Sequence, residues 1–190
     1  MKKATIIAAL LMSSAAATFA QTWSVDKAHS RLGFNVTHMN ISETSGSFKI
    51  TDAKITASKP DFSDAVIELT ADVKSIDTDN EQRDGHLKSP DFFDAEKFPT
   101  LTFKSTSFKK VGDKKYKLTG NLTLHGVTKP VVLDVVFNGT VENPMSKKTM
   151  AGFNISGIVK RSDFGIATGM PAAMLGDGVT LQASTEFAKD

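Results

Sequence analysis

The densest group of residues able to do chemistry lies in the stretch "RDGHLKSPDFFDAEKFP", where Arg83, Asp84 and His86 precede three phenylalanines. A guanidinium, a carboxylate and an imidazole at this spacing could perform acid/base catalysis or bind the polar head of a ligand. The same residues could also form a solvated helix face, with Asp84 stabilising the first helical turn. The stretch is therefore a candidate polar site whose role depends on the surrounding fold.

Histidine spacing does not indicate a metal site. The four histidines lie on different predicted elements: His29, His38, His86 and His125. None belongs to an HxH or HExxH pattern and the chain has no cysteine, so we predict no metal site and no other cofactor. His38 shares strand parity with Phe34 and Val36, which points its imidazole to an apolar face. A core histidine bonded to a backbone carbonyl is favoured there over a ligand contact.

Motifs and charge balance argue against several other classes of protein. The sequence contains no nucleophile elbow, P-loop, dinucleotide-binding glycine motif or EF-hand, which lowers the expectation of an enzyme. Catalytic residues assembled from distant positions are still an alternative. The chain has 23 Lys and Arg against 21 Asp and Glu, and removal of Lys2 and Lys3 with a leader segment would balance these charges. We therefore expect no nucleic-acid partner.

The first 20 residues are typical of a secretory signal peptide. Lys2 and Lys3 precede the apolar run Ala4–Met12, and small residues follow up to Ala20. We therefore expect residues 1–20 to direct export and residues 21–190 to form one domain. The apolar run is too short to cross a bilayer and no later segment approaches about 20 apolar residues, so no stable membrane insertion is expected.

Alternation of apolar and polar residues predicts an all-β domain. The pattern is clearest in residues 32–38, 65–73 and 131–137, and it continues less regularly over 46–57, 101–108, 116–124, 150–160 and 179–187. Turn residues at Ser45-Gly46, Gly112-Asp113, Asn138-Gly139 and Gly176-Asp177-Gly178 predict hairpins. We expect an antiparallel eight-stranded β-barrel, because closure removes exposed edges, and a β-sandwich is the alternative.

Two segments interrupt the strand pattern. Capping residues at 77–80 and the pair Ser89-Pro90 predict a short helical insertion with two helix starts. Residues 162–178 form a long irregular connection that contains Met170 and Met174. This connection could cover the mouth of the barrel, or it could pack on the outside as an ordinary loop.

Several stretches resemble one known family. "SIDTDNEQRDGHLKSPDFFDAEKFPTLTFKS", "GNLTLHGVTKPVVLDVVFNG" and "GIVKRSDFG" resemble the YceI-like family of bacterial periplasmic proteins, and "WSVDKAHSRLGFNVTH" looks like that family's first strands. The resemblance implies a lipocalin-like β-barrel with an apolar tunnel, a short helical segment near its mouth and residence in the periplasm. It also implies binding of a polyisoprenoid or a similar long-chain amphiphile, and it is consistent with a homodimer.

The resemblance assigns the candidate polar site to the mouth of the tunnel. Arg83, Asp84 and His86 would meet the head of the ligand. Arg161 in "KRSDFG" would either bind an anionic head or pair with Asp163 at a strand end. The other expected ligand contacts are Phe34, Val36, His38, Phe48, Phe92, Phe93, Phe103, Phe137, Phe153 and Phe164. Phe98 would continue the tunnel wall with Phe92 and Phe93. Further lining candidates are Ile50, Ile67, Leu69, Leu122, Leu133, Val135 and Phe187.

We therefore expect a noncatalytic periplasmic carrier that holds a lipid tail in an apolar barrel. Two alternatives use the same fold. One is an enzyme acting on an isoprenoid-type ligand, with His38 or His86 as the general base. The other is a protein whose barrel is a filled core and whose surface binds another envelope protein.

Overall fold

The computed structural model describes residues 20–190, so the expected signal peptide lies outside the described residues except for Ala20. The strands are β1 (Gln21–Val25), β2 (Arg31–His38), β3 (Ser42–Ala57), β4 (Val66–Asp77), β5 (Thr100–Gly112), β6 (Lys115–Leu124), β7 (Val127–Glu142), β8 (Thr149–Lys160) and β9 (Leu175–Lys189). The helical segments are α1 (Glu81–Leu87) and the 3₁₀ helix η1 (Arg161–Phe164). All the strands predicted from alternation are present, and β1 is an additional short one.

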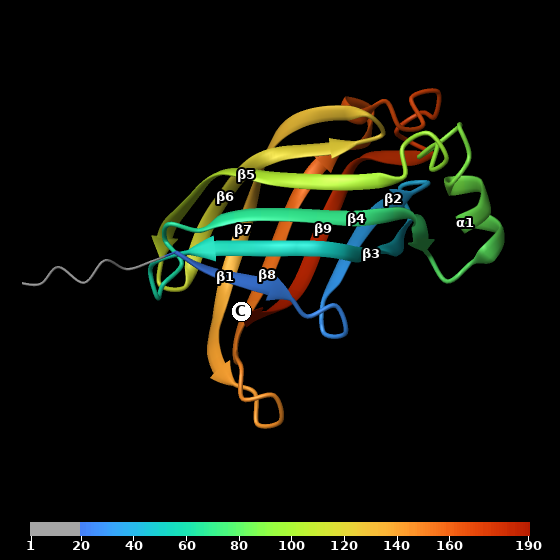
Figure 1. Ribbon diagram of the computed structural model, residues 1–190. Coiled ribbons are helices and arrows are strands. Elements are labelled where there is room, and N and C mark those ends of the chain that lie inside the picture. The colour runs from blue at the N-terminus through green and yellow to red at the C-terminus, as the bar shows by residue number, and fades with distance from the viewer. Residues whose placement is uncertain (1–19) are drawn as a thin grey trace, which may run out of the picture.

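The sheet closes on itself (Figure 1). Each strand from β3 to β9 pairs antiparallel with the next along the chain, and β2 joins β3 to β9. Strand β1 also pairs with β3 and β9, so it shares one position in the ring with β2. The nine strands thus occupy the eight positions of a closed antiparallel barrel, which confirms the predicted barrel and makes the sandwich alternative wrong.

Three of the predicted turns lie inside strands. Ser45-Gly46 belongs to β3, and the β2–β3 turn is at Met39 and Asn40, whose φ angles are 51° and 57°. A Cβ at Gly46 would lie 2.4 Å from Cζ of Phe34, so this glycine permits a close packing contact. Asn138-Gly139 forms a bulge in β7, and the glycines at 176 and 178 belong to β9. Gly112-Asp113 does border the β5–β6 turn.

Helix α1 begins at a predicted cap. The side-chain oxygen of Asn80 accepts a 2.9 Å hydrogen bond from the backbone N–H of Arg83. The predicted second helix at Ser89-Pro90 does not form, because residues 88–97 fold into successive turns. In these turns the N–H groups of Phe92 and Asp94 both donate to the carbonyl of Ser89, at 3.1 and 2.9 Å. Helix α1 and the turns that follow it project beyond one end of the barrel, and we call this end the mouth (Figure 1).

The opposite end of the barrel is closed by aromatic side chains. The β3–β4 connection places Phe62 against Trp23, Phe137 and Phe153, with ring centroids 5.1, 5.2 and 5.2 Å apart. Phe62 is only 2% exposed and has a φ of 58°, a conformation that a bulky residue adopts only where packing over-determines it. These four residues, the aromatic plug, leave the mouth as the open end.

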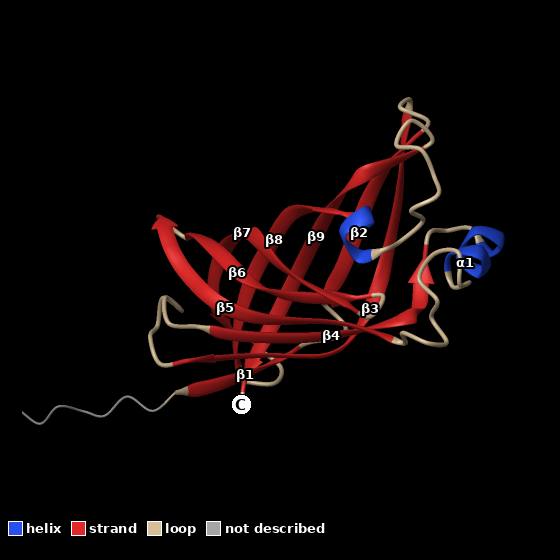
Figure 2. Cartoon of the chain, turned by 90° about the horizontal axis from the view of Figure 1, so that it is seen from above, coloured by secondary structure: helices blue, strands red, loops and turns tan. Residues whose placement is uncertain are grey.

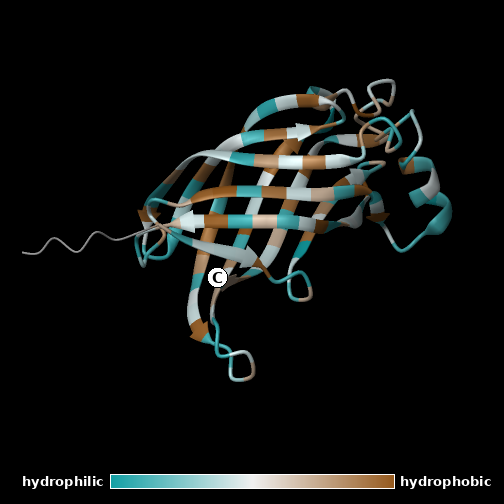
Figure 3. Ribbon diagram, in the orientation of Figure 1, coloured by the Kyte–Doolittle hydropathy of each residue, from teal (hydrophilic) through white to brown (hydrophobic). Residues whose placement is uncertain are grey.

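Apolar and polar residues alternate along the strands, whereas α1 is mostly hydrophilic (Figure 3). On β7, Leu133 and Val135 are buried, while Val132 and Val136 are exposed on the outer wall. This alternation produces an apolar interior inside a mixed surface. Within residues 20–190, no helix has the length and apolar character needed to span a membrane.

Candidate functional site

The barrel contains a cavity of about 430 Å³, within the range of small-molecule sites. Strands β2 to β9 all contribute lining residues, and α1, its following turns and the η1–β9 connection line the mouth. The cavity extends inward to Phe153 of the aromatic plug and to Phe187, whose ring centroid lies 6.0 Å from that of Phe153. Among the described residues no Asp or Glu lines it, so its charged or titratable lining consists of histidine and arginine side chains.

Most residues expected to contact a ligand line this cavity: Phe34, Val36, His38, Phe48, Arg83, His86, Phe92, Phe93, Phe103, Phe153, Arg161 and Phe164. The further candidates Ile67, Leu69, Leu122, Leu133, Val135 and Phe187 do so as well, and Ile50 does not. Asp84, Phe137 and Asp163 were predicted as ligand contacts too, but they do not line the cavity. Phe137 lies in the aromatic plug, stacked on Phe153 with ring centroids 5.1 Å apart, and the β7 bulge follows it directly.

Of the three predicted polar residues, Arg83 and His86 line the cavity, whereas Asp84 has a structural role. Asp84 accepts hydrogen bonds from the backbone N–H and the hydroxyl of Thr78, at 2.9 and 2.5 Å, which fastens α1 to the end of β4. Arg83 lines the cavity and donates from Nε and Nη2 to the hydroxyl and carbonyl oxygens of Thr78, at 2.8 and 2.6 Å. Its Nη1 makes no hydrogen bond to residues 20–190, so it can donate to a ligand.

His86 lies on the rim of the cavity with an apolar neighbour. Its ring and that of Phe92 pack edge to face with centroids 4.8 Å apart, and its Nε2 is 3.8 Å from a carboxylate oxygen of Asp91, beyond hydrogen-bond distance. Phe93 reaches inward and packs edge-on against Phe48 at 5.5 Å. The wall role expected for Phe98 was wrong, because its ring packs over Gly126 and against His125.

Arg161 is buried and fully hydrogen-bonded. Its five N–H donors reach the backbone carbonyls of Gly176, Ile166, Ala167, Met170 and Leu175, at 2.5 to 3.2 Å. The predicted pair with Asp163, which is exposed, does not form. With all five donors on carbonyls, Arg161 has none left to donate to an anionic head in this structure. Arg161 instead holds the η1–β9 connection in place.

The η1–β9 connection forms part of the mouth, which agrees with the predicted cover of the barrel and not with an outer loop. Ile166, Met170 and Met174 line the cavity, and Figure 2 shows η1 and the connection toward the end that carries α1. The carboxylate of Asp177 accepts from the backbone N–H and hydroxyl of Ser162, at 3.0 and 2.9 Å. These hydrogen bonds hold the pKa of Asp177 below its usual value.

His38 faces the cavity side, as its parity predicted, but it is exposed at the end of β2. The expected buried imidazole was therefore wrong, since β2 ends at this residue. Sequence reasoning missed Thr78, which is 4% exposed and lines the cavity. Its hydroxyl donates to Asp84 and accepts from Arg83. The position of Thr78 after a predicted strand and among the predicted capping residues 77–80 was the available signal.

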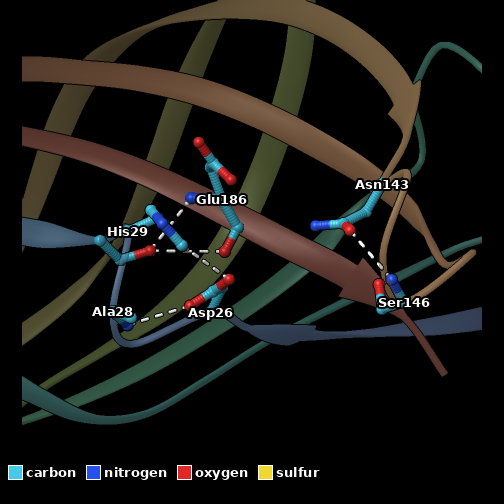
Figure 4. Close-up of polar contacts among 7 residues, drawn as sticks. Asp26, Ala28, His29, Asn143, Ser146 and Glu186 are labelled. Atoms are coloured by element: carbon cyan, nitrogen blue, oxygen red, sulfur yellow. Dashed lines mark hydrogen bonds and ion pairs between the residues drawn. The ribbon is translucent and has the colours of Figure 1, made fainter.

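One titratable cluster lies on the outer wall, where the β1–β2 connection meets β9 (Figure 4). Asp26, His29 and Glu186 each place one atom that could bind a metal ion within 4.8 Å of the other two. The spacing of these residues in the sequence did not indicate such a group. Nδ1 of His29 lies 2.9 Å from a carboxylate oxygen of Asp26. This hydrogen bond and the negative charges of both acids raise the pKa of His29, and the same bond lowers that of Asp26. Asp26 and His29 therefore satisfy each other's hydrogen bonding as an exposed ion pair.

Comparison with known proteins gives consistent matches over nearly the whole described chain. Protein YceI of Salmonella newport is 38% identical over 169 residues, which cover 88% of this chain and 87% of the relative. The crystal structure of Burkholderia cenocepacia BcnA matches with a TM-score of 0.74 and 25% identity, covering 85% of this chain and 98% of that one.

A polyisoprenoid binding domain from Saccharophagus degradans, implicated in plant cell wall breakdown, matches with a TM-score of 0.66. The match covers 90% of this chain and 99% of that one, and at 14% identity it concerns the fold alone. The family model described as the YceI-like domain matches residues 23–187. The match spans all the strands of the barrel together with the mouth segments, and this chain therefore belongs to the YceI-like family.

Proposed function

We propose that this protein binds a polyisoprenoid or a similar long-chain amphiphile inside the barrel and carries it through the periplasm without altering it. The observation that carries the proposal is the apolar cavity, which the aromatic plug closes at one end and which opens beside Arg83 at the other. The tail would lie toward the plug and the head at the mouth. The shared fold with a polyisoprenoid binding domain supports this choice of ligand.

The energetics assign separate roles to the cavity and the mouth. Each methylene removed from water contributes about 0.8 kcal/mol, so a long tail easily exceeds the roughly 8 kcal/mol of a micromolar complex. A tail drawn from a bilayer is already out of water, so this contribution nearly cancels. Contacts with the head, together with the fit of the cavity, must then decide whether the lipid is extracted.

The mouth favours an anionic or strongly hydrogen-bonding head. Nη1 of Arg83 has unused donors there, and no carboxylate among the described residues lines the cavity to repel an anion. Replacing Arg83 by Ala should weaken binding of a polyprenyl phosphate by roughly tenfold and leave a neutral long-chain amide nearly unchanged. Arg31→Ala, an exposed arginine outside the cavity, is the matched control. Equal losses of affinity for the phosphate and the amide would contradict a charge-specific role for Arg83.

The first experiment is to express the protein with its leader segment, purify it from the periplasm without detergent, and identify bound molecules by native mass spectrometry and organic extraction. A stoichiometric long-chain amphiphile is the expected result. Stable, empty protein that also refuses added polyprenyl lipids would overturn the proposal and favour the surface-interaction alternative.

Catalysis has a separate test. After incubation with a polyprenyl ester or phosphate, the recovered ligand should be chemically unchanged, because Asp84 is committed to Thr78 and is not paired with His86. Turnover that disappears in His86→Ala would show that the protein is an enzyme acting on the ligand.

A further inference from the structure

Exposed apolar side chains gather at the mouth. Met39 and Ile41, in and beside the β2–β3 turn, are 54% and 83% exposed, and Met174 of the η1–β9 connection is 54% exposed. The backbone N–H of Met39 donates a 2.9 Å hydrogen bond to the carbonyl of Met174, so the two segments lie side by side. With Met170, also exposed, these residues form one surface, which we call the apolar lip.

The chain around the apolar lip carries almost no charge. Residues 32–42 contain no Lys, Arg, Asp or Glu, and neither do residues 164–176, although 23% of the whole chain is charged. Separate stretches of sequence therefore supply two adjoining uncharged surfaces. A basic surface would suit an anionic membrane or a nucleic acid, whereas this one suits an uncharged, apolar environment.

The apolar lip is continuous with the cavity. Met170 and Met174 are exposed to solvent and also line the cavity, so the same side chains form its outer edge and its inner wall. Their backbone is held in advance, because Arg161 donates to the carbonyls of Met170 and Leu175 at 2.8 and 3.0 Å. Side chains presented on a fixed backbone lose less conformational freedom when they bind a surface.

We propose that the apolar lip docks on the surface of a lipid bilayer, with Ile41 and the methionines among the lipid headgroups and upper acyl chains. The purpose of this docking rests on the proposed function: an amphiphile tail could then pass between the bilayer and the cavity past Met170 and Met174 without crossing water. Exposure of a long tail to water is the main energetic barrier to such transfer. Because the lip lacks basic residues, docking requires no anionic lipid.

The test is flotation of the purified protein with vesicles of pure phosphatidylcholine, at low salt and at 0.5 M NaCl. Wild type should float with the vesicles at both salt concentrations. The Met39→Asp/Ile41→Asp variant, whose two positions are exposed and do not line the cavity, should partition at least roughly tenfold less, because each change removes an apolar contact and adds a charge. Ile158→Asp is the matched control, since Ile158 is 71% exposed on the outer wall of β8.

A second measurement separates this inference from the proposed function. Wild type and the double variant should bind a polyprenyl phosphate added from ethanol equally well, while the variant should acquire the same lipid from vesicles at least roughly tenfold more slowly. Equal flotation and equal transfer rates would overturn docking and leave the proposed function standing. Failure of both proteins to bind the added lipid would overturn the proposed function, while flotation would still decide docking.

Two further outcomes would overturn the lip as a membrane surface. One is flotation that needs anionic lipid and is abolished by salt, which would indicate electrostatic binding elsewhere on the molecule. The other is a wild-type dimer that becomes a monomer in the Met39→Asp/Ile41→Asp variant, detected by sedimentation velocity without vesicles. In that case a second copy of the chain covers the lip.

Discussion

Nη2 of Arg161 donates a 2.8 Å hydrogen bond to the carbonyl of Met170, so a buried cation on one side of the mouth fixes a methionine on its edge. The other N–H groups of this guanidinium bind four more carbonyls, all from residues 166–176. The connection between η1 and β9 is therefore an ordered part of the wall, although it contains little regular secondary structure.

Replacing Arg161 by Met should lower the free energy of unfolding by about 3 kcal/mol or more, because buried carbonyls lose charged donors that water cannot replace. Arg161→Lys should restore only part of this loss, since an ammonium group has three donors in place of five. Urea unfolding monitored by circular dichroism measures both effects. Lys160→Met, at the exposed neighbouring position, should be nearly neutral. Similar unfolding midpoints for the variants at 160 and 161 would contradict the role of the carbonyl cluster.

Filling the cavity should block binding and spare the fold. Val135 is 3% exposed and lines the cavity, whereas Val136, the next residue of β7, is 41% exposed on the outer wall. Val135→Trp should reduce uptake of a long-chain ligand at least tenfold, measured by native mass spectrometry, because the added rings occupy cavity space. Val136→Trp adds the same side chain to the outside and should bind like wild type. Undiminished uptake by Val135→Trp would place the ligand elsewhere.

Gly120 should tolerate no side chain. A Cβ at this position would lie 2.6 Å from the carbonyl oxygen of Lys104 and 2.3 Å from Cζ of Phe103. Gly120→Ala should therefore cost about 1–3 kcal/mol in unfolding free energy, since the neighbouring strand must shift. Gly152→Ala is the control, because its nearest neighbouring atom would be 3.5 Å away. Equal thermal midpoints for the two variants would show that β5 and β6 can separate without cost.

The exposed pair of Asp26 and His29 should respond to pH in a defined direction. The raised pKa of His29 means that the pair's contribution is present below the ordinary histidine pKa of about 6.5 and is lost as the pH rises through the folded value. At acidic pH it is lost again, as Asp26 becomes protonated below its own lowered pKa. An NMR titration should place the midpoint of His29 above 6.5, and Asp26→Asn should lower it. Asp134→Asn, outside this cluster, should not change it; an unchanged midpoint in Asp26→Asn would contradict the pairing.

The sequence predicted the barrel because its information on strands is local. Alternation identifies which residues of 131–137 face inward, and the caps at 77–80 identify the start of α1. Strand β1 has only five residues, too few for alternation to distinguish it, and only the family resemblance suggested it. The glycine-containing pairs in β3 and β7 were read as turns because glycine serves close packing and bulges as readily as it serves turns.

The site was less predictable where its partners are distant or lie in the backbone. Side-chain patterns suggested Asp163 as the partner of Arg161, but the acceptors are carbonyls, which every residue carries and which only the folded connection gathers. Asp84 was expected at the ligand, yet Thr78, six positions earlier, binds its carboxylate. Parity placed Phe34 and Phe48 correctly on the cavity wall, because inward orientation depends only on the strand itself.

The aromatic plug around Phe62 makes the barrel a blind tube. A molecule long enough to fill it enters tail first and leaves head first through the same opening, so it cannot turn round inside or pass from one end to the other. Such a protein cannot serve as a conduit between two simultaneously bound partners. If the protein carries a lipid as we propose, a donor and an acceptor use the mouth in turn, and the loaded protein must leave the donor before it meets the acceptor.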